Sequence, residues 1–133
     1  MPSMANITVK KSDGTTDVVY TGVCPSSGDA VAAVWRSETG GACAALKPTL
    51  TSVTKTNGAK TARQVEVNFA FPWGVTDSTT GVTSVKNKVP MKFFAAVPME
   101  IPDAVIAEAV AQGLNLLGSA IIREVVKSGY SPT

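Results

Sequence analysis

The chain contains no histidine and few charged residues. Its 133 residues include 12 Lys and Arg and 10 Asp and Glu, so the charged fraction is only 17%. Without histidine there is no Ser–His or Cys–His nucleophile pair and no zinc site that uses imidazole. The glycines match neither a phosphate-binding loop nor a dinucleotide fingerprint, and Glu66 has no second carboxylate on its own strand face. We therefore expect no enzymatic activity, no metal and no cofactor.

Cysteines and long apolar runs are also scarce. Cys24 and Cys43 are the only cysteines, which is too few for a disulfide framework or a metal site. We expect both to be reduced, and a disulfide between them is the alternative. The first eleven residues lack a continuous apolar run, so no signal peptide is expected. Polar residues interrupt the apolar stretch Ala104–Leu117, so no membrane span is expected either.

The low charge predicts that part of the surface is covered. Soluble domains carry roughly 25% charged residues, and a large obligate subunit interface is the simplest cover; a charge-poor compact monomer is the alternative. The net charge is only +2, but the basic residues cluster. Those in the two basic segments are Lys47, Lys55, Lys60, Arg63, Lys86, Lys88 and Lys92. Local positive potential attracts phosphate, although solubilising surface lysines would give the same pattern.

The first three quarters of the chain predict β-strands joined by turns. The predicted strands are Asn6–Lys11, Asp17–Val23, Pro48–Thr56, Ala62–Phe71 and Pro90–Val97. Asp13-Gly14 and Asn57-Gly58 are typical hairpin turns between them. Ala30–Glu38 is compatible with a short strand or a helical turn, and Thr39-Gly40-Gly41 ends it. Residues 74–88 are small and polar and predict a long functional or mobile loop.

The strand over Ala62–Phe71 has one apolar and one polar face. The apolar face carries Val65, Val67, Phe69 and Phe71, and the polar face carries Gln64, Glu66 and Asn68. A period of two with unlike faces predicts an antiparallel sheet that is covered on one side only.

The last quarter predicts two helices after Pro98 and Pro102. Asp103 suits the first turn or N-cap of the first helix, Ser119 the N-cap of the second, and Gly129 its end. Helical spacing relates Ile106, Val110, Leu114 and Leu117, and then Ile121, Ile122, Val125 and Val126. The predicted fold class is α+β in a single domain of residues 1–133, with an antiparallel sheet over about 6–100 and helices over about 103–129.

Several runs in this layout resemble the coat proteins of single-stranded RNA bacteriophages, the levivirus group. The N-terminal hairpin around Asp13-Gly14 is similar, as are the central and C-terminal segments. The matching runs there are Lys47-Pro48-Thr49-Leu50-Thr51, Gln64-Val65-Glu66-Val67, Ala111-Gln112-Gly113-Leu114, Ala120-Ile121 and Ser128-Gly129-Tyr130. They occur in the family's order over nearly the whole chain.

The resemblance implies a capsid protein of the virion, assembled in the bacterial host cytoplasm. In this family two chains interlock as a homodimer, with the C-terminal helices of each laid over the sheet of the other. Dimers then build an icosahedral shell whose inner sheet face binds the single-stranded RNA genome. Some members repress translation through an RNA hairpin. The residues expected at the dimer interface are Ile106, Val110, Leu114, Leu117, Ile122 and Val126.

The resemblance also implies RNA-binding residues on the polar sheet face. Matching runs give Lys47, Thr49, Thr51, Gln64, Glu66 and Asn68, and alternation along the last strand adds Lys92 and Phe94, with packing in the core as the alternative for Phe94. Lys47 would contact phosphate, Thr49, Thr51 and Gln64 would bind an unpaired base, and Phe94 would stack on one. Gln64 and Ala62 stand where well-known members carry lysine and threonine, so general RNA contact is expected rather than sequence-specific hairpin binding. A small RNA-binding β-sheet module that does not assemble is the leading alternative, followed by an adhesive β-protein.

Overall fold

The computed structural model describes residues 2–39 and 43–133. Most of the predicted break at Thr39-Gly40-Gly41 therefore lies outside the described residues. Contacts divide the chain into two compact units, Met1–Val97 and Pro98–Thr133. The first contains strands and the second contains helices, so the predicted α+β fold class is confirmed. The single domain and the interlocked dimer stay predictions.

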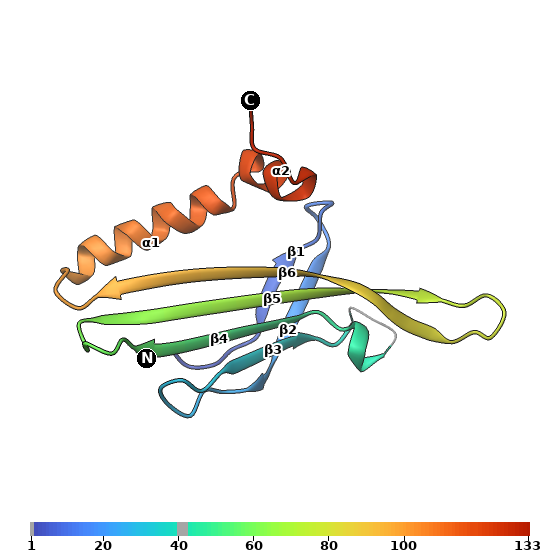
Figure 1. The fold of residues 1–133 in the computed structure, drawn as a ribbon, viewed down its shortest axis with the longest axis horizontal. Helices are drawn as coiled ribbons and strands as arrows, with labels where there is room; N and C mark the ends of the chain where they lie inside the picture. The colour runs from blue at the N-terminus through green and yellow to red at the C-terminus, as the bar shows by residue number, and fades with distance from the viewer. Residues whose placement is uncertain (1, 40–42) are drawn as a thin grey trace. The chain divides into compact units, whose positions relative to one another are not determined.

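The first unit is a six-stranded sheet whose strands lie in chain order (Figure 1). The strands are β1 (Ile7–Lys10), β2 (Asp17–Cys24), β3 (Ala33–Ser37), β4 (Thr49–Thr56), β5 (Ala62–Thr76) and β6 (Thr83–Pro98). A short 3₁₀ helix, η1 (Ala44–Leu46), precedes β4. Pairing is antiparallel from β1 through β5. Within the ambiguous segment Ala30–Glu38, residues Ala33–Ser37 form a strand, β3.

Side chains close both predicted hairpin turns. Asp13 accepts hydrogen bonds from the backbone of Thr15 and Thr16 and from the Thr16 hydroxyl, at 2.6–3.0 Å. These bonds, with that from the Thr16 hydroxyl the strongest, lower the pKa of Asp13 to about 2. Gly14 has a φ of 75°, which glycine adopts without steric cost. In the second turn the Asn57 side chain accepts the backbone N–H of Thr61 at 2.9 Å.

The prediction of a long loop over residues 74–88 was wrong. β5 continues to Thr76 and β6 begins at Thr83, so only residues 77–82 connect them. The Thr76 and Thr83 hydroxyls lie 2.9 Å apart across this hairpin, and Asp77 N–H donates to the Val82 carbonyl. The small polar residues favour turns only locally, and pairing with the facing strand overrides that preference.

Gly74 in β5 is closely packed against η1 and β6. A Cβ at Gly74 would lie 2.5 Å from Leu46 Cδ2 and 3.0 Å from the Ser84 carbonyl oxygen. Leu46, in η1, is one of few buried side chains. Glycine is therefore required there for η1 and β6 to approach β5.

The second unit consists of α1 (Asp103–Leu117) and α2 (Ala120–Ser128). Asp103 lies in the first turn of α1, after Pro102 at the N-cap. Ser119 is the N-cap residue of α2 but makes no side-chain capping bond, and Gly129 ends the helix with a φ of 81°. Neither helix is long and apolar enough to cross a membrane by itself; as a pair, bent by 52°, they reach that length and composition.

Candidate nucleic-acid interface

The strand register gathers polar side chains on one face of the sheet. Thr49 pairs with Ala70, Thr51 with Asn68, and Lys55 with Gln64. Directly opposite residues point to the same side of an antiparallel sheet. The register therefore places the predicted residues of β4 and β5 on a common surface, which we call the polar face. It comprises Thr49, Thr51, Val53, Lys55, Gln64, Glu66, Asn68 and Ala70.

The polar face continues onto β3. Arg36 pairs with Thr49 and Val34 with Thr51, so both lie on the same side as the β4 threonines. Beyond the end of β3 the Glu38 carboxylate lies 2.6 Å from Lys47 Nζ and 2.8 Å from Arg36 Nη2. The hydrogen bond from Lys47 and then that from Arg36 lower the pKa of Glu38.

A groove runs along the polar face between β4, β5 and β6. Its volume is about 550 Å³. It is lined by Thr49, Thr51, Asn68, Phe69, Ala70, Lys88, Pro90, Met91 and Lys92. Hydroxyl, amide and ammonium groups thus lie at one open depression, beside the apolar side chains of Phe69, Pro90 and Met91.

A second acid lies beside this groove. Glu66 Oε1 is 3.0 Å from Lys92 Nζ and accepts a hydrogen bond from Asn68 Nδ2 at 3.2 Å. The bond from Lys92, followed by that from Asn68, lowers the pKa of Glu66. The contact fixes Lys92 on the polar face, as alternation along its strand predicts.

The structure brings most of the predicted RNA-binding residues together. Thr49, Thr51, Asn68 and Lys92 line the groove, and Glu66 adjoins it. Lys47 follows η1 and precedes β4, and Gln64 lies in β5 on the polar face. Phe94 shares the alternation of Lys92 and is 54% exposed, but it does not line the groove. The RNA-binding role of all eight residues stays a prediction.

Sequence reasoning did not assign Arg36, Glu38, Lys88 or Pro90 to this surface. Lys88 was expected in a loop, but it belongs to β6 and alternates with Pro90 and Lys92. That period of two was the signal for it. Arg36 and Glu38 were missed because the alanine-rich segment before them left the strand undecided.

The opposite side of the sheet carries a cluster of apolar side chains. Tyr20 and Phe69 pack edge to face with ring centroids 6.1 Å apart, and Phe69 and Phe71 lie 6.4 Å apart. Leu50 pairs with Phe69, and Trp35 with Leu50, so these side chains share what we call the apolar face. Much of it is accessible, since Phe71 is 49% exposed. The buried residues in the described part of the chain are Tyr20, Ser37, Leu46 and Pro48.

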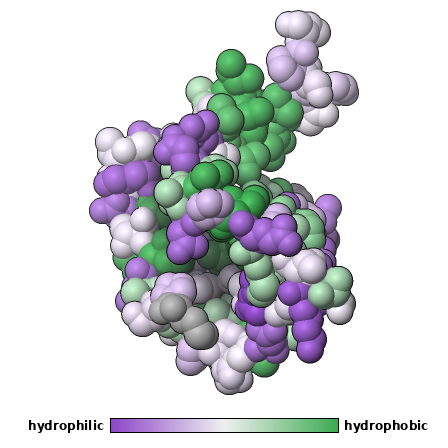
Figure 2. All heavy atoms as spheres, turned by 90° about the vertical axis from the view of Figure 1, so that its left-hand side faces the viewer, coloured by the Kyte–Doolittle hydropathy of each residue, from purple (hydrophilic) through white to green (hydrophobic). Residues whose placement is uncertain are grey.

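The helices also leave apolar side chains exposed. Val110, Leu114, Leu117 and Val126 are 47–59% exposed, and neither helix has a buried residue. Figure 2 shows apolar side chains gathered into a patch over the C-terminal helices, below the pale C-terminal tail. Of the predicted interface residues, Ile106 and Ile122 are partly buried. The interface assignment itself stays a prediction.

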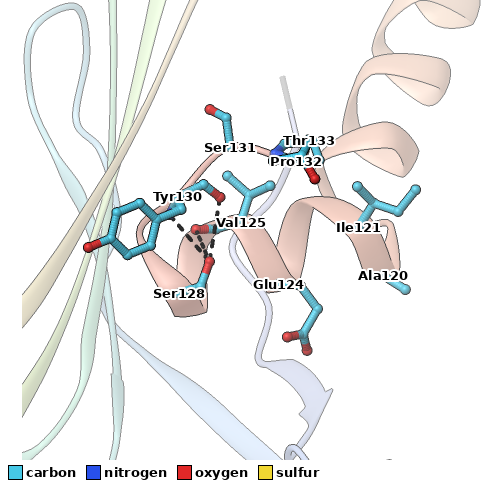
Figure 3. A pocket seen from close by; sticks show the side chains of 9 residues that line it. All are labelled: Ala120, Ile121, Glu124, Val125, Ser128, Tyr130, Ser131, Pro132 and Thr133. Carbon is cyan, nitrogen blue, oxygen red and sulfur yellow. Dashed lines mark hydrogen bonds between the residues drawn. The ribbon is translucent and has the colours of Figure 1, made fainter.

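The C-terminal tail folds beside α2. The Ser128 hydroxyl accepts the Tyr130 backbone N–H at 3.3 Å (Figure 3). The tail and the helix enclose a groove of about 490 Å³, toward which Ile121 and Val125 contribute apolar surface (Figure 3). Tyr130 is 80% exposed.

Residues typical of metal or redox chemistry do not cluster in the part of the chain that the structure describes. Within it no group of three or more Cys, Asp and Glu side chains could hold a metal ion. Cys24 and Cys43 are both free and exposed in the structure, and that they stay reduced remains a prediction.

Comparison with known proteins identifies the fold through structure alone. No family model and no curated protein sequence matches the chain. Among solved structures, the virus-like particle of Beihai levi-like virus 21 superimposes with a TM-score of 0.83 at 15% identity, covering 99% of both chains. The virus-like particle of bacteriophage NT-214 gives 0.83 at 14% identity, covering 99% of this chain and 100% of the other.

The capsid protein of bacteriophage GA is also similar, with a TM-score of 0.68 and 22% identity over 96% of this chain and 95% of that one. The chain has the fold of single-stranded RNA phage coat proteins. This confirms the fold that the resemblance in the sequence implied.

Proposed function

We propose that the protein is a coat protein of a single-stranded RNA bacteriophage, with a structural and not an enzymatic role. It dimerises, assembles into an icosahedral shell and binds RNA on the polar face. The observation that carries the proposal is the combination of this fold with apolar surface that one chain leaves uncovered on both its sheet and its helices.

The exposed apolar residues support an obligate dimer. Burial of apolar surface contributes roughly 25 cal/mol per Å², and isolated soluble domains rarely expose large continuous apolar patches. Phe71 on the sheet and Leu114 and Leu117 on α1 are each about half exposed. Laying the helices of one chain over the apolar face of the other would bury both sets, as the family's interlocked dimer does.

The outer edge of β6 supports the same dimer. β6 has 16 residues and ends the sheet, whereas the opposite edge strand, β1, has only 4. A long open edge exposes backbone donors and acceptors that readily pair with another chain. Antiparallel pairing of β6 with the β6 of a second copy would join the two sheets into one and extend the polar face across the dimer.

RNA binding is supported by the composition of the groove. Lys and Arg supply the positive charge that attracts phosphate, and Lys88 and Lys92 both line the groove. Unpaired bases are recognised through hydrogen bonds to their edges, which Thr49, Thr51 and Asn68 can supply. The same surface in a translational repressor would bind an RNA hairpin, and in a virion it would face the genome.

Expression of the chain in bacteria, followed by electron microscopy of the purified material, tests the proposal. Hollow regular particles that protect RNA from nuclease are expected. A discrete dimer or monomer with nuclease-sensitive RNA would instead identify a non-assembling RNA-binding module. Particles without any RNA would retain the coat function and remove RNA binding.

A further inference from the structure

We propose that Arg36 and Lys47 form a phosphate-binding site that Glu38 occupies when RNA is absent, so that Glu38 limits how tightly the sheet retains RNA. This inference rests on the proposed RNA binding and deepens it. It assigns a role to Arg36 and Glu38, and it identifies the ligand as a phosphate of the RNA backbone.

Two cations converge on one carboxylate at this site. Lys47 Nζ lies 2.6 Å from Glu38 Oε2. Arg36 donates to the other oxygen, Oε1, from Nε at 2.9 Å and from Nη2 at 2.8 Å. The fork of the Arg36 guanidinium is thus directed at a single anionic group together with an ammonium. A phosphate offers the same combination of negative charge and acceptor oxygens, and arginine binds both kinds of anion.

Solvent reaches the site, so an exchange of anions is sterically possible. The side chains of Arg36, Lys47 and Glu38 are 35%, 21% and 43% exposed. Exposed ion pairs contribute little free energy, typically below about 1 kcal/mol. A polyanion that brings several phosphates to the face can therefore displace the carboxylate without disturbing the fold.

The strand register connects this site to the groove. Arg36 pairs with Thr49, which lines the groove, and Lys47 precedes Thr49 by two residues on the same face. A strand of RNA whose base enters the groove would pass its backbone close to the two cations. By contrast, Lys88 forms no ion pair with any described residue, so it needs no such exchange.

The test is the affinity of the full chain, purified free of RNA, for a short labelled oligouridylate at a series of salt concentrations. Glu38→Gln keeps the size of the side chain but removes its charge and replaces one acceptor oxygen with an amide donor. Glu124→Gln is the matched control, because Glu124 also faces a lysine, Lys127, at 3.9 Å but lies on α2. Size-exclusion chromatography verifies that both variants keep the wild-type assembly state.

Glu38→Gln is expected to tighten binding about threefold to tenfold at moderate salt. It should also steepen the dependence of log affinity on log salt by about 0.7, the value for one additional single-strand phosphate contact. Glu124→Gln is expected to match the wild type. The double variant Glu38→Gln, Lys47→Ala should lose the gain.

The failure of this inference is separable from failure of the proposed function. If Glu38→Gln binds like the wild type while Lys92→Ala weakens binding, the sheet binds RNA but Glu38 does not compete for it. If Glu124→Gln tightens binding as much as Glu38→Gln, the effect is one of net charge, and the site is wrong. If the wild type does not bind oligouridylate at all, the proposed RNA binding fails together with the site.

Discussion

The two faces of the sheet consist of alternate residues of the same strands, but they differ in how far one chain completes them. On the polar face each acid has a partner, as with Glu38 and its two cations and with Glu66 and Lys92. On the apolar face Phe71 remains half exposed. The charges of one face are therefore paired within the chain, whereas the other face leaves apolar surface that the proposed dimer would cover.

The largest expected effect comes from placing a charge on the exposed apolar surface of α1. Leu114→Asp should abolish dimers and particles, because burying an unpaired carboxylate costs several kcal/mol. Asn115→Asp adds the same charge one residue farther along α1 and serves as the control. Size-exclusion chromatography and electron microscopy measure the result. Particles in normal yield from Leu114→Asp would show that α1 does not lie in an interface.

The next effect concerns the polar face. Lys47→Ala combined with Lys92→Ala should lower the RNA content of the particles and reduce the salt slope of RNA binding by about 1.4, since each lost phosphate contact accounts for about 0.7. Dimers should persist, because both ammonium groups lie outside the apolar face. The ratio of absorbance at 260 and 280 nm reports the RNA content. An unchanged ratio would remove these lysines from the RNA contact.

A smaller effect is expected where contacts close within one chain. Gly74→Ala would place a Cβ 2.5 Å from Leu46 Cδ2, and such overpacking lowers the free energy of unfolding by about 1–3 kcal/mol. Gly58→Ala is the control, because nothing lies within 4 Å of a Cβ there. Urea denaturation at fixed protein concentration measures both. Equal midpoints for the two variants would show that η1 does not pack against β5 in solution.

The smallest effect is expected at the first hairpin turn, where Asp13 is solvent-exposed. The pKa of Asp13 falls from 3.8 to about 2 on folding. A lowered pKa means that the carboxylate stabilises the folded state above about pH 4 and that this contribution disappears as the pH falls toward 2. The difference in thermal midpoint between wild type and Asp13→Asn should shrink over that range. A difference that stays constant would contradict the low pKa.

Local sequence patterns predicted much of this fold for physical reasons. Alternation over Ala62–Phe71 predicted a sheet with one apolar face, and helical spacing predicted α1 and α2. Each pattern reflects which side of an element meets apolar surroundings. The polar face followed from the same alternation. Its extension onto β3 did not, since alanines carry no clear preference for strand or helix and the pairing with β4 decides the structure there.

Long-range pairing explains the main error. Residues 74–88 contain the small polar residues that favour turns, and no local signal shows that Thr83 onward pairs with β5. The ion pairs of Arg36 and Lys47 with Glu38 were equally unpredictable from the sequence. Residues 36 and 47 come together only because β3 pairs with β4. The features that could not be predicted are those that depend on pairing between residues far apart in the sequence.

The tight packing at Gly74 holds the β5–β6 hairpin against η1 at one point. Beyond this point the paired strands carry the turn at residues 77–82 roughly 10–15 Å outward, at about 3.3 Å per residue. A rotation of the hairpin by a few degrees about Gly74 would shift the turn at residues 77–82 by about an ångström, while the hydrogen bonds of the hairpin stay intact. In the proposed shell, the paired strands would tilt as one stiff unit, without refolding a loop.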